Sequence, residues 1–403
     1  MKLTNLNKNI LEESIINLTM DLVKFPTQGG LDSCENISKL IIKWCESKNI
    51  PINKLTYQGK FSGLLIEIEG TKSGPTICLN ACLDTSPVDD FESWMFDPFT
   101  PTIVKNWLYG RGTADSKTAI SIFLHIAQIY SITTFAGTLH ILFDAEEHTG
   151  NFYGIKSYAK RYPNIDGMYL GYPGRDKICV GSRGFLRFKI IFKGRSGHSG
   201  ESIPLGKNPI DLLGLFIKKV NSIDVAKYYD PEMHKYPKFT ITSVHSGNSF
   251  TSTPDKCETL IDIRLTKSFQ ANQAREIIQQ ILKSIETKFS CNDSTLLKEL
   301  ESWPAYKIPD HHFLVYSLQN ASFQIDGRHL NLTVSGPSNI GNFMSTFDIP
   351  VVSGFGVEYK NLHSINERIN LKTIWGCYSI YLLALDNMFK RNKIRRQRKL
   401  LHA

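Results

Sequence analysis

The chain contains 403 residues, a length that favours two domains over a single hydrophobic core. Hydrophobic residues make up 41% and charged residues 21% of the sequence, which is ordinary for a soluble globular protein. No apolar run reaches the roughly 18 residues that a membrane-spanning helix needs, so the composition excludes an integral membrane protein of that kind.

The net charge of +9 is concentrated at one end of the chain. Seven lysines and arginines lie within residues 390–403, and the rest of the sequence is nearly balanced. We interpret this basic tail as solvated. The alternative is a weak electrostatic contact with RNA or with an anionic surface. The charge therefore does not by itself indicate a nucleic-acid-binding protein.

The cysteines and the amino-terminal segment indicate a cellular compartment. The first residues are polar and lack the apolar core and small-residue cleavage site of a signal peptide. The eight cysteines are scattered, without CxxC spacing, and several lie in apolar stretches. We therefore expect reduced, buried thiols in a cytoplasmic protein.

The first part of the chain alternates helical and strand patterns. Continuous apolar strands alternating with helices favour a largely parallel sheet covered on both faces. In such sheets, ligands bind beyond the carboxyl ends of the strands. The predicted helices cover residues 9–24, 33–48 and 118–130, and the predicted strands cover residues 63–69, 76–83, 137–143 and 167–170.

The middle of the chain changes to a β-α-β-β-α-β order, which is typical of a ferredoxin-like domain. Its predicted strands cover 184–192, 238–245, 256–265 and 294–300, with helices at 208–223 and 272–287. The α/β pattern then resumes with strands at 330–335 and 349–353 and a helix at 371–389. We therefore predict an α/β domain (1–183 and 303–389), an inserted domain (184–302) and the tail (390–403).

Four segments rich in acidic residues or histidine follow predicted strands, where the active site of an α/β protein belongs. Adjacent carboxylates beside an apolar strand are costly unless a cation or a proton compensates them. The alternative, helix capping, accounts for a single member of the set and not for all four. The segments are Cys82–Asp84, Gly110–Asp115, Asp144–His148 and His363–Glu367.

These motifs resemble a known family. Residues 108–117 (LYGRGTADSK), 145–147 (AEE) and 363–369 (HSINERI) are its most specific stretches. They are similar to the di-zinc amidohydrolases that include acetylornithine deacetylase, succinyl-diaminopimelate desuccinylase, the aminoacylases and the glutamate-releasing carboxypeptidase. The resemblance covers about residues 10–385. It implies a zinc-peptidase-like catalytic domain with an inserted ferredoxin-like lid or dimerisation domain.

The resemblance also implies a role for each matching residue. Asp115 corresponds to the carboxylate that bridges two metal ions, while Glu147 and His363 correspond to ligands of one of them. Glu146 corresponds to the general base that takes a proton from the attacking water. His198 corresponds to a histidine that reaches across a dimer to stabilise the tetrahedral intermediate, with a hydrogen-bonded turn histidine as the alternative.

Two departures from the family pattern fall on the other metal ion. Cys82 replaces a histidine ligand, and Tyr172 replaces an acidic ligand. Cysteine is a good zinc ligand in general, but tyrosine resists deprotonation because its pKa is near about 10. Asp84 corresponds to the carboxylate that orients the missing histidine. We expect this first metal position to bind weakly or to be empty, unless Asp176 or His148 substitutes.

Three further positions bear on the substrate. Asn339 and Thr251 stand where relatives often carry aspartate and asparagine, which indicates a changed pocket. Arg264 stands where several relatives carry an arginine that pairs with a substrate carboxylate. The alternative for Arg264 is an ordinary ion pair with a surface acid.

The sequence therefore predicts a metal-dependent hydrolase. Its substrate is a small molecule, an N-acyl amino acid or small peptide with a free carboxylate, and its cofactor is one zinc ion, with two possible and cobalt or manganese as substitutes. Family analogy implies a homodimer. The alternatives are a catalytically impaired protein that binds such ligands, or a biosynthetic amide-forming or cyclising enzyme.

Overall fold

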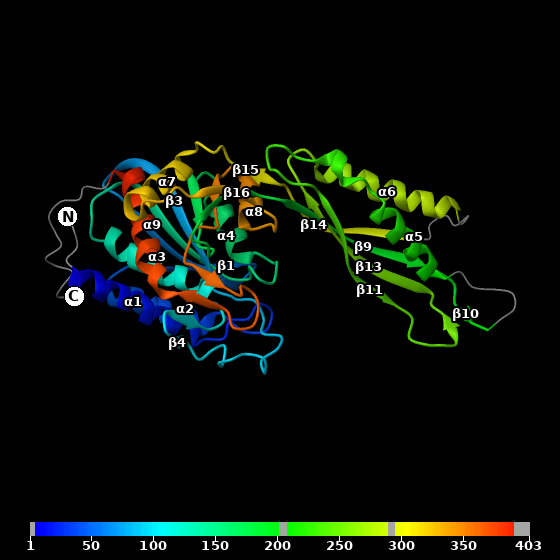
Figure 1. Ribbon diagram of the computed structural model, residues 1–403, viewed down its shortest axis with the longest axis horizontal. Coiled ribbons are helices and arrows are strands. Elements are labelled where there is room, and N and C mark those ends of the chain that lie inside the picture. The colour runs from blue at the N-terminus through cyan, green and yellow to red at the C-terminus, as the bar shows by residue number, and fades with distance from the viewer. Residues whose placement is uncertain (1–4, 201–207, 289–294, 391–403) are drawn as a thin grey trace. The chain divides into compact units, whose positions relative to one another are not determined.

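The structure is a computed structural model that describes residues 5–200, 208–288 and 295–390. It divides into two compact units (Figure 1). Unit 1 contains residues 1–180, 308–333 and 347–403, and unit 2 contains residues 181–307 and 334–346. Residues 334–346, which we expected in the larger domain, group with unit 2. The predicted tail from residue 391 onward and Cys291 lie outside the described residues.

The chain passes between the units four times. The crossings fall within β8 (Lys177–Ser182), after β15 (Tyr306–Lys307), within β16 (Asn331–Ser335) and within the 3₁₀ helix η3 (Ser345–Phe347).

Unit 1 is built on a six-stranded sheet with the order β1-β2-β6-β3-β7-β17. The β1–β2 and β2–β6 pairs are antiparallel, and the β6–β3, β3–β7 and β7–β17 pairs are parallel. The mixed, mainly parallel sheet that the sequence predicted is therefore confirmed. The strands are β1 (Asn53–Tyr57), β2 (Lys60–Glu69), β3 (Lys72–Cys82), β6 (Ala136–Asp144), β7 (Gly167–Leu170) and β17 (Val351–Val352).

Helices cover this sheet because its central strands are apolar on both faces. Residues 77–82 of β3 and 139–144 of β6 are all buried. Helix α3 packs against β3, β6 and β2, and α4 packs against β1, β2 and β6. Helices α1, α7 and α9 pack with α3 as one layer. The helices of unit 1 are α1 (Asn5–Val23), α2 (Glu35–Ser47), α3 (Thr118–Tyr130), α4 (Tyr153–Arg161), α7 (Phe313–Asp326) and α9 (Ile374–Phe389).

A smaller sheet in unit 1 carries the loops that complete the site. Its order is β18-β19-β5-β4, and all three pairings are antiparallel. The sequence analysis did not predict these strands, which are two or three residues long. They are β4 (Thr102–Val104), β5 (Trp107–Tyr109), β18 (Tyr359–Lys360) and β19 (Arg368–Asn370), with the π-helical turn η1 (Thr113–Lys117) after β5 and the 3₁₀ helix η4 (Leu371–Thr373) after β19.

Unit 2 contains an antiparallel sheet with the order β11-β13-β9-β14. Helices α5 and α6 lie together on one face of this sheet, over a core of buried residues drawn from positions 186–285. This is the predicted ferredoxin-like arrangement. The elements are β9 (Gly184–Lys193), α5 (Pro209–Asn221), β11 (Lys238–Ser246), β13 (Lys256–Leu265), α6 (Ala271–Lys288) and β14 (Thr295–Trp303), with the short β10 (Gly197–His198), η2 (Val225–Tyr228), β12 (Ser252–Thr253) and α8 (Ile340–Met344).

No helix among the described residues is long and apolar enough to cross a membrane. The seven cysteines in the described parts of the chain are buried and unpaired. The expectation of buried thiols is met at these positions.

Candidate metal centre

The predicted site residues of unit 1 lie in loops at one edge of the main sheet. Strands β3, β6 and β7 run parallel, so their carboxyl ends meet at the same edge. Two segments after other strands join them, η1 and the loop between β18 and β19. The residues in these positions are Asp84 after β3, Glu146, Glu147 and His148 after β6, Tyr172 after β7, Asp115 in η1 and His363 before β19.

Three of these side chains form a group that can hold a metal ion. One ligand atom from each of Asp115, His148 and His363 lies within 4.8 Å of the others. His363 Nε2 is 3.0 Å and His148 Nε2 is 3.5 Å from Asp115 Oδ2. One carboxylate and two imidazoles suit zinc, with an open position for water. The structure thus brings the predicted Asp115 and His363 together and adds His148.

The local electrostatics favour a charged Asp115. Burial opposes ionisation of this carboxyl group, but the contacts with His148 and His363 outweigh burial and lower the pKa of Asp115. Burial also opposes a charge on His148, yet Glu147, Asp115 and Asp84 raise the pKa of this imidazole well above its ordinary value. The carboxylates around His148 therefore favour a positive charge at this position.

Glu147 makes two contacts at the edge of this group. The Tyr172 hydroxyl donates a hydrogen bond to Glu147 Oε1 over 2.9 Å. Glu147 Oε2 lies 3.2 Å from His148 Nδ1. Burial raises the pKa of Glu147, with His148 acting in the opposite direction. Glu147 is not a member of the three-residue group, and its role as a metal ligand stays a prediction.

Cys82 and Tyr172 lie beside the group without joining it. Burial, and then the neighbouring carboxylates, raise the pKa of the Cys82 thiol and of the Tyr172 phenol well above their ordinary values. Both side chains therefore stay protonated in the metal-free site, and each has to lose its proton to bind a metal ion. Asp176, considered as a substitute, is 85% exposed and pairs with Arg328 at 2.8 Å.

Glu146, the predicted general base, adopts a left-handed backbone conformation with φ of 68°. Its Oε2 accepts hydrogen bonds from Thr149 Oγ1 (2.8 Å) and from Asn151 Nδ2 (2.9 Å). These donors hold the carboxyl group in a fixed orientation within the loop. Its catalytic role stays a prediction.

A buried ion pair connects two loops of the site. Arg111 Nη1 lies 2.5 Å from Glu367 Oε2, and both side chains are at most 3% exposed. Glu367 Oε1 also accepts a hydrogen bond from the backbone of Ala114, next to Asp115. Gly112 permits this turn because its φ is +80° and a Cβ there would lie 2.6 Å from Thr85. The sequence analysis placed Glu367 within a motif and missed this role.

The predicted site residues of unit 2 have structural partners. His198 lies exposed in β10, where its Nδ1 accepts a hydrogen bond from Gly200 N. Asn339 caps α8, with Oδ1 accepting from Gly341 N at 2.8 Å. These contacts neither support nor contradict the predicted roles of His198 in catalysis and of Asn339 in substrate binding.

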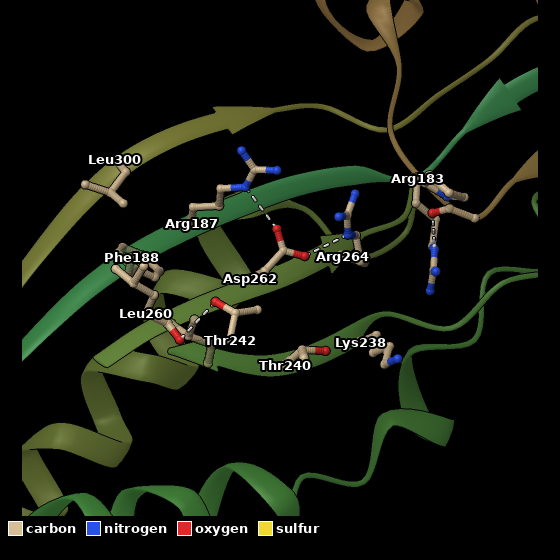
Figure 2. A pocket seen from close by; sticks show the side chains of 13 residues that line it. Arg183, Arg187, Phe188, Lys238, Thr240, Thr242, Leu260, Asp262, Arg264 and Leu300 are labelled. Atoms are coloured by element: carbon tan, nitrogen blue, oxygen red, sulfur yellow. Dashed lines mark hydrogen bonds and ion pairs between the residues drawn. The ribbon is translucent and has the colours of Figure 1, made fainter. Parts of the chain in front are cut away.

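Arg264 lines a basic cavity of about 570 Å³ on the sheet of unit 2. Figure 2 shows Arg264 and Arg187 converging on Asp262, at 2.7 and 3.0 Å. Arg264 therefore forms the ion pair with an acid that the sequence analysis gave as the alternative to substrate binding. Arg183 and Lys238 also line the cavity, so four cations surround one carboxylate there. The excess of positive charge leaves the cavity able to bind an anion.

Comparison with known proteins agrees with this architecture. Residues 180–289 match the peptidase dimerisation domain of the M20 family. Succinyl-diaminopimelate desuccinylase from Ehrlichia ruminantium (strain Welgevonden) is 26% identical over 393 residues, covering 93% of this chain and 97% of the relative. The desuccinylase from Helicobacter pylori (strain HPAG1) is 27% identical over 322 residues, covering 77% of this chain and 79% of the relative.

Solved structures give the same result. The di-peptidase Dug1p from Saccharomyces cerevisiae matches with a TM-score of 0.76 at 15% identity, covering 95% of this chain and 97% of that chain. A dinuclear metal-binding peptidase of the M20 family from Bacillus subtilis matches with a TM-score of 0.70 at 18% identity, covering 94% and 99%. The chain has the M20 metallopeptidase fold. The family resemblance and the two-part fold predicted from the sequence are confirmed, and the M20 relatives support metal-dependent amide hydrolysis in general terms.

Proposed function

We propose that the protein is a metal-dependent hydrolase that cleaves the amide bond of an N-acyl amino acid or small peptide with a free carboxylate. The observation that carries this proposal is the group formed by Asp115, His148 and His363 at the sheet edge, next to the Glu146–Glu147 pair. The names of the similar proteins, a desuccinylase and a di-peptidase, support the same type of reaction.

The residues of the site supply the groups that this reaction needs. Asp115 and His363, together with Glu147 or His148, would hold a divalent ion, which when bound would lower the pKa of a water molecule and polarise the amide carbonyl. Glu146 accepts the proton of the attacking water as the new C–O bond forms. It then returns this proton to the nitrogen as the C–N bond breaks and the amine leaves.

The proposal specifies one ion, zinc, which cobalt or manganese can replace. Support comes from Cys82 and Tyr172, which stand where the family pattern has a histidine and a carboxylate and which lie outside the group of Asp115, His148 and His363. A phenol is a poor zinc ligand compared with the carboxylate that it replaces.

A cationic side chain is needed to bind the substrate carboxylate. We assign this role to Arg264, which lines the basic cavity of unit 2. The match of residues 180–289 to a peptidase dimerisation domain supports a homodimer. The buried, unpaired cysteines support a reducing, cytoplasmic environment.

The test combines metal analysis with a hydrolysis screen of N-acyl amino acids and dipeptides. Glu146→Gln removes the proton acceptor, so we expect kcat to fall by about 10²- to 10⁴-fold with unchanged zinc content. Glu46→Gln is the matched control, because Glu46 is exposed in α2 far along the chain from the site, and it should retain full activity.

A second candidate function is a binding protein without hydrolytic activity. Cys82 and Tyr172 favour it, because they replace two ligands of the family pattern and lie outside the group of Asp115, His148 and His363, and the loss of one metal position can end catalysis. A purified protein that contains no metal and hydrolyses no more than Glu146→Gln would establish this second function and rule out the first.

A further inference from the structure

We propose that His148 is a metal ligand that replaces, from a different loop, the histidine that is absent at position 82, and that Asp84 orients it. This inference rests on the proposed function only in assuming that the site binds a divalent ion. It changes the ligand set from that of the family pattern, because the ligand comes from the segment after β6 instead of from the end of β3.

In the family pattern, the aspartate at the position of Asp84 orients a histidine two residues earlier. Cys82 offers no imidazole in this chain. Asp84 faces the loop after β6 instead: its carboxylate accepts hydrogen bonds from the backbone N–H groups of Glu147 (3.1 Å) and His148 (2.8 Å). Its Oδ2 also lies 3.5 Å from His148 Nδ1. The orienting carboxylate is therefore present and directed at a different histidine.

The second argument concerns the ring of His148. Its side chain is only 4% exposed, and neither ring nitrogen has a hydrogen-bond partner among the described residues. A buried polar atom without a hydrogen-bond partner destabilises the folded protein. An ion at Nε2 would satisfy one nitrogen, and Nδ1 lies close to two carboxylates, Glu147 Oε2 at 3.2 Å and Asp84 Oδ2 at 3.5 Å. A metal-ligating histidine with its second nitrogen on a carboxylate is a common arrangement in proteins.

The third argument is the direction of the two imidazoles. His148 Nε2 and His363 Nε2 both point to Asp115 Oδ2, at 3.5 and 3.0 Å. The two ring centroids are 5.3 Å apart and the rings are inclined at 67°. Together with the Asp115 oxygen, these two nitrogens form a set of three ligand atoms within 4.8 Å of one another, which one cation can bind.

The experiment measures metal binding on the full-length chain, independently of hydrolysis. Zinc affinity is determined by calorimetric titration of the chelator-treated protein, and cobalt absorption reports the ligands around the ion. We expect His148→Ala to lower zinc affinity by at least about 100-fold, and Asp84→Asn to lower it by about 10- to 100-fold. His311→Ala, at an exposed histidine, is the matched control and should leave affinity and spectrum unchanged.

A rescue variant distinguishes a ligand from a structural residue. In the His148→Ala background, Cys82→His returns an imidazole to the family position, next to the same Asp84. We expect this double variant to recover most of the lost zinc affinity. Recovery is not expected if His148 only supports the fold of the loop.

X-ray absorption of the zinc-loaded, unmodified protein provides a measurement that requires no variant. Two imidazoles around the zinc support the assignment, and a single imidazole overturns it. Wild-type zinc affinity in His148→Ala also overturns it. The outcome can be distinguished from that of the proposed function. If the protein binds zinc through His148 but hydrolyses no substrate, this inference is supported and the proposed hydrolase function is contradicted.

Discussion

At the scale of single residues, the proposal of one metal ion depends on Cys82 and Tyr172. Both positions are visible in the sequence as departures from a family pattern. Their effect depends on the surroundings, because burial and nearby carboxylates keep the thiol and the phenol protonated. Tyr172 also donates a hydrogen bond to Glu147, so it has become part of the carboxylate network.

Restoring the family pattern is therefore a direct test. The double variant Cys82→His with Tyr172→Glu adds one imidazole and one carboxylate beside Asp115. We expect its zinc content, measured by elemental analysis, to rise from about one ion per chain toward about two. The new carboxylate lies near Glu147, Asp84 and Asp115, so a bound cation relieves the repulsion between these groups. The Tm of the double variant should therefore depend more strongly on zinc than the Tm of the wild type. Unchanged zinc content and Tm would show that these residues do not correspond to the lost metal position.

The sequence predicted Asp115, Glu146, Glu147 and His363 as site residues because their motifs are specific, and the structure groups Asp115 and His363. The sequence analysis left His148 as one of two possible substitutes, since the sequence alone does not show where the side chain of a histidine after two glutamates points. The tertiary structure distinguishes the two candidates. His148 is buried next to Asp84, whereas Asp176 is exposed and pairs with Arg328.

At the scale of elements, helix α3 carries a buried histidine that makes folding sensitive to acid. His125 Nδ1 bonds the carbonyl of Ser121, and its Nε2 bonds Ser14 of α1, at 2.8 and 2.9 Å. The carbonyl can only accept, so the ring is protonated at Nδ1 and accepts at Nε2. Burial lowers the pKa of His125 to about 4. The packing of α1 on α3 thus requires a neutral imidazole.

The pH dependence of stability follows from this shift. Between about pH 6.5 and about pH 4 the unfolded chain binds a proton at His125 that the folded chain does not, so the free energy of unfolding decreases as the pH falls through this window. The contribution is complete above the unfolded pKa and amounts to about 3 kcal/mol.

Denaturant unfolding at several pH values measures this effect. His125→Gln should be less stable near neutral pH but should lose less stability on acidification than the wild type. His311→Gln, at an exposed position, is the control and should follow the wild-type curve. An equal loss in all three proteins would show that the charge on His125 has no part in acid sensitivity.

Most of the longer elements were predicted because their hydrophobic pattern is strong, whereas helix α7 was not predicted. The ranges predicted for α3, β7 and β13 agree with the structure to the residue. The small sheet of β4, β5, β18 and β19 was not predicted. Strands of two or three residues show no measurable period, and they form here because Arg111 and Glu367 tie the loops around them together.

At the scale of the whole molecule, the dimerisation domain of unit 2 predicts that two chains associate. We expect sedimentation equilibrium of the full-length protein to give twice the mass of one chain. The value should hold over a range of concentrations, because association through a dedicated domain is stronger than incidental contact. A mass of one chain at all accessible concentrations would contradict the prediction and remove any catalytic role of His198 from a partner chain.

The division of unit 1 into three separate segments sets an order of events during synthesis. Asp115 and His148 leave the ribosome before unit 2 begins, whereas β17 and His363 follow only after residue 347. The buried core of unit 2 lies entirely within positions 186–285, so its residues are all available earlier. The inserted domain can therefore fold before the main sheet of unit 1 has received its last strand, and a nascent chain has no complete ligand group until translation is nearly finished.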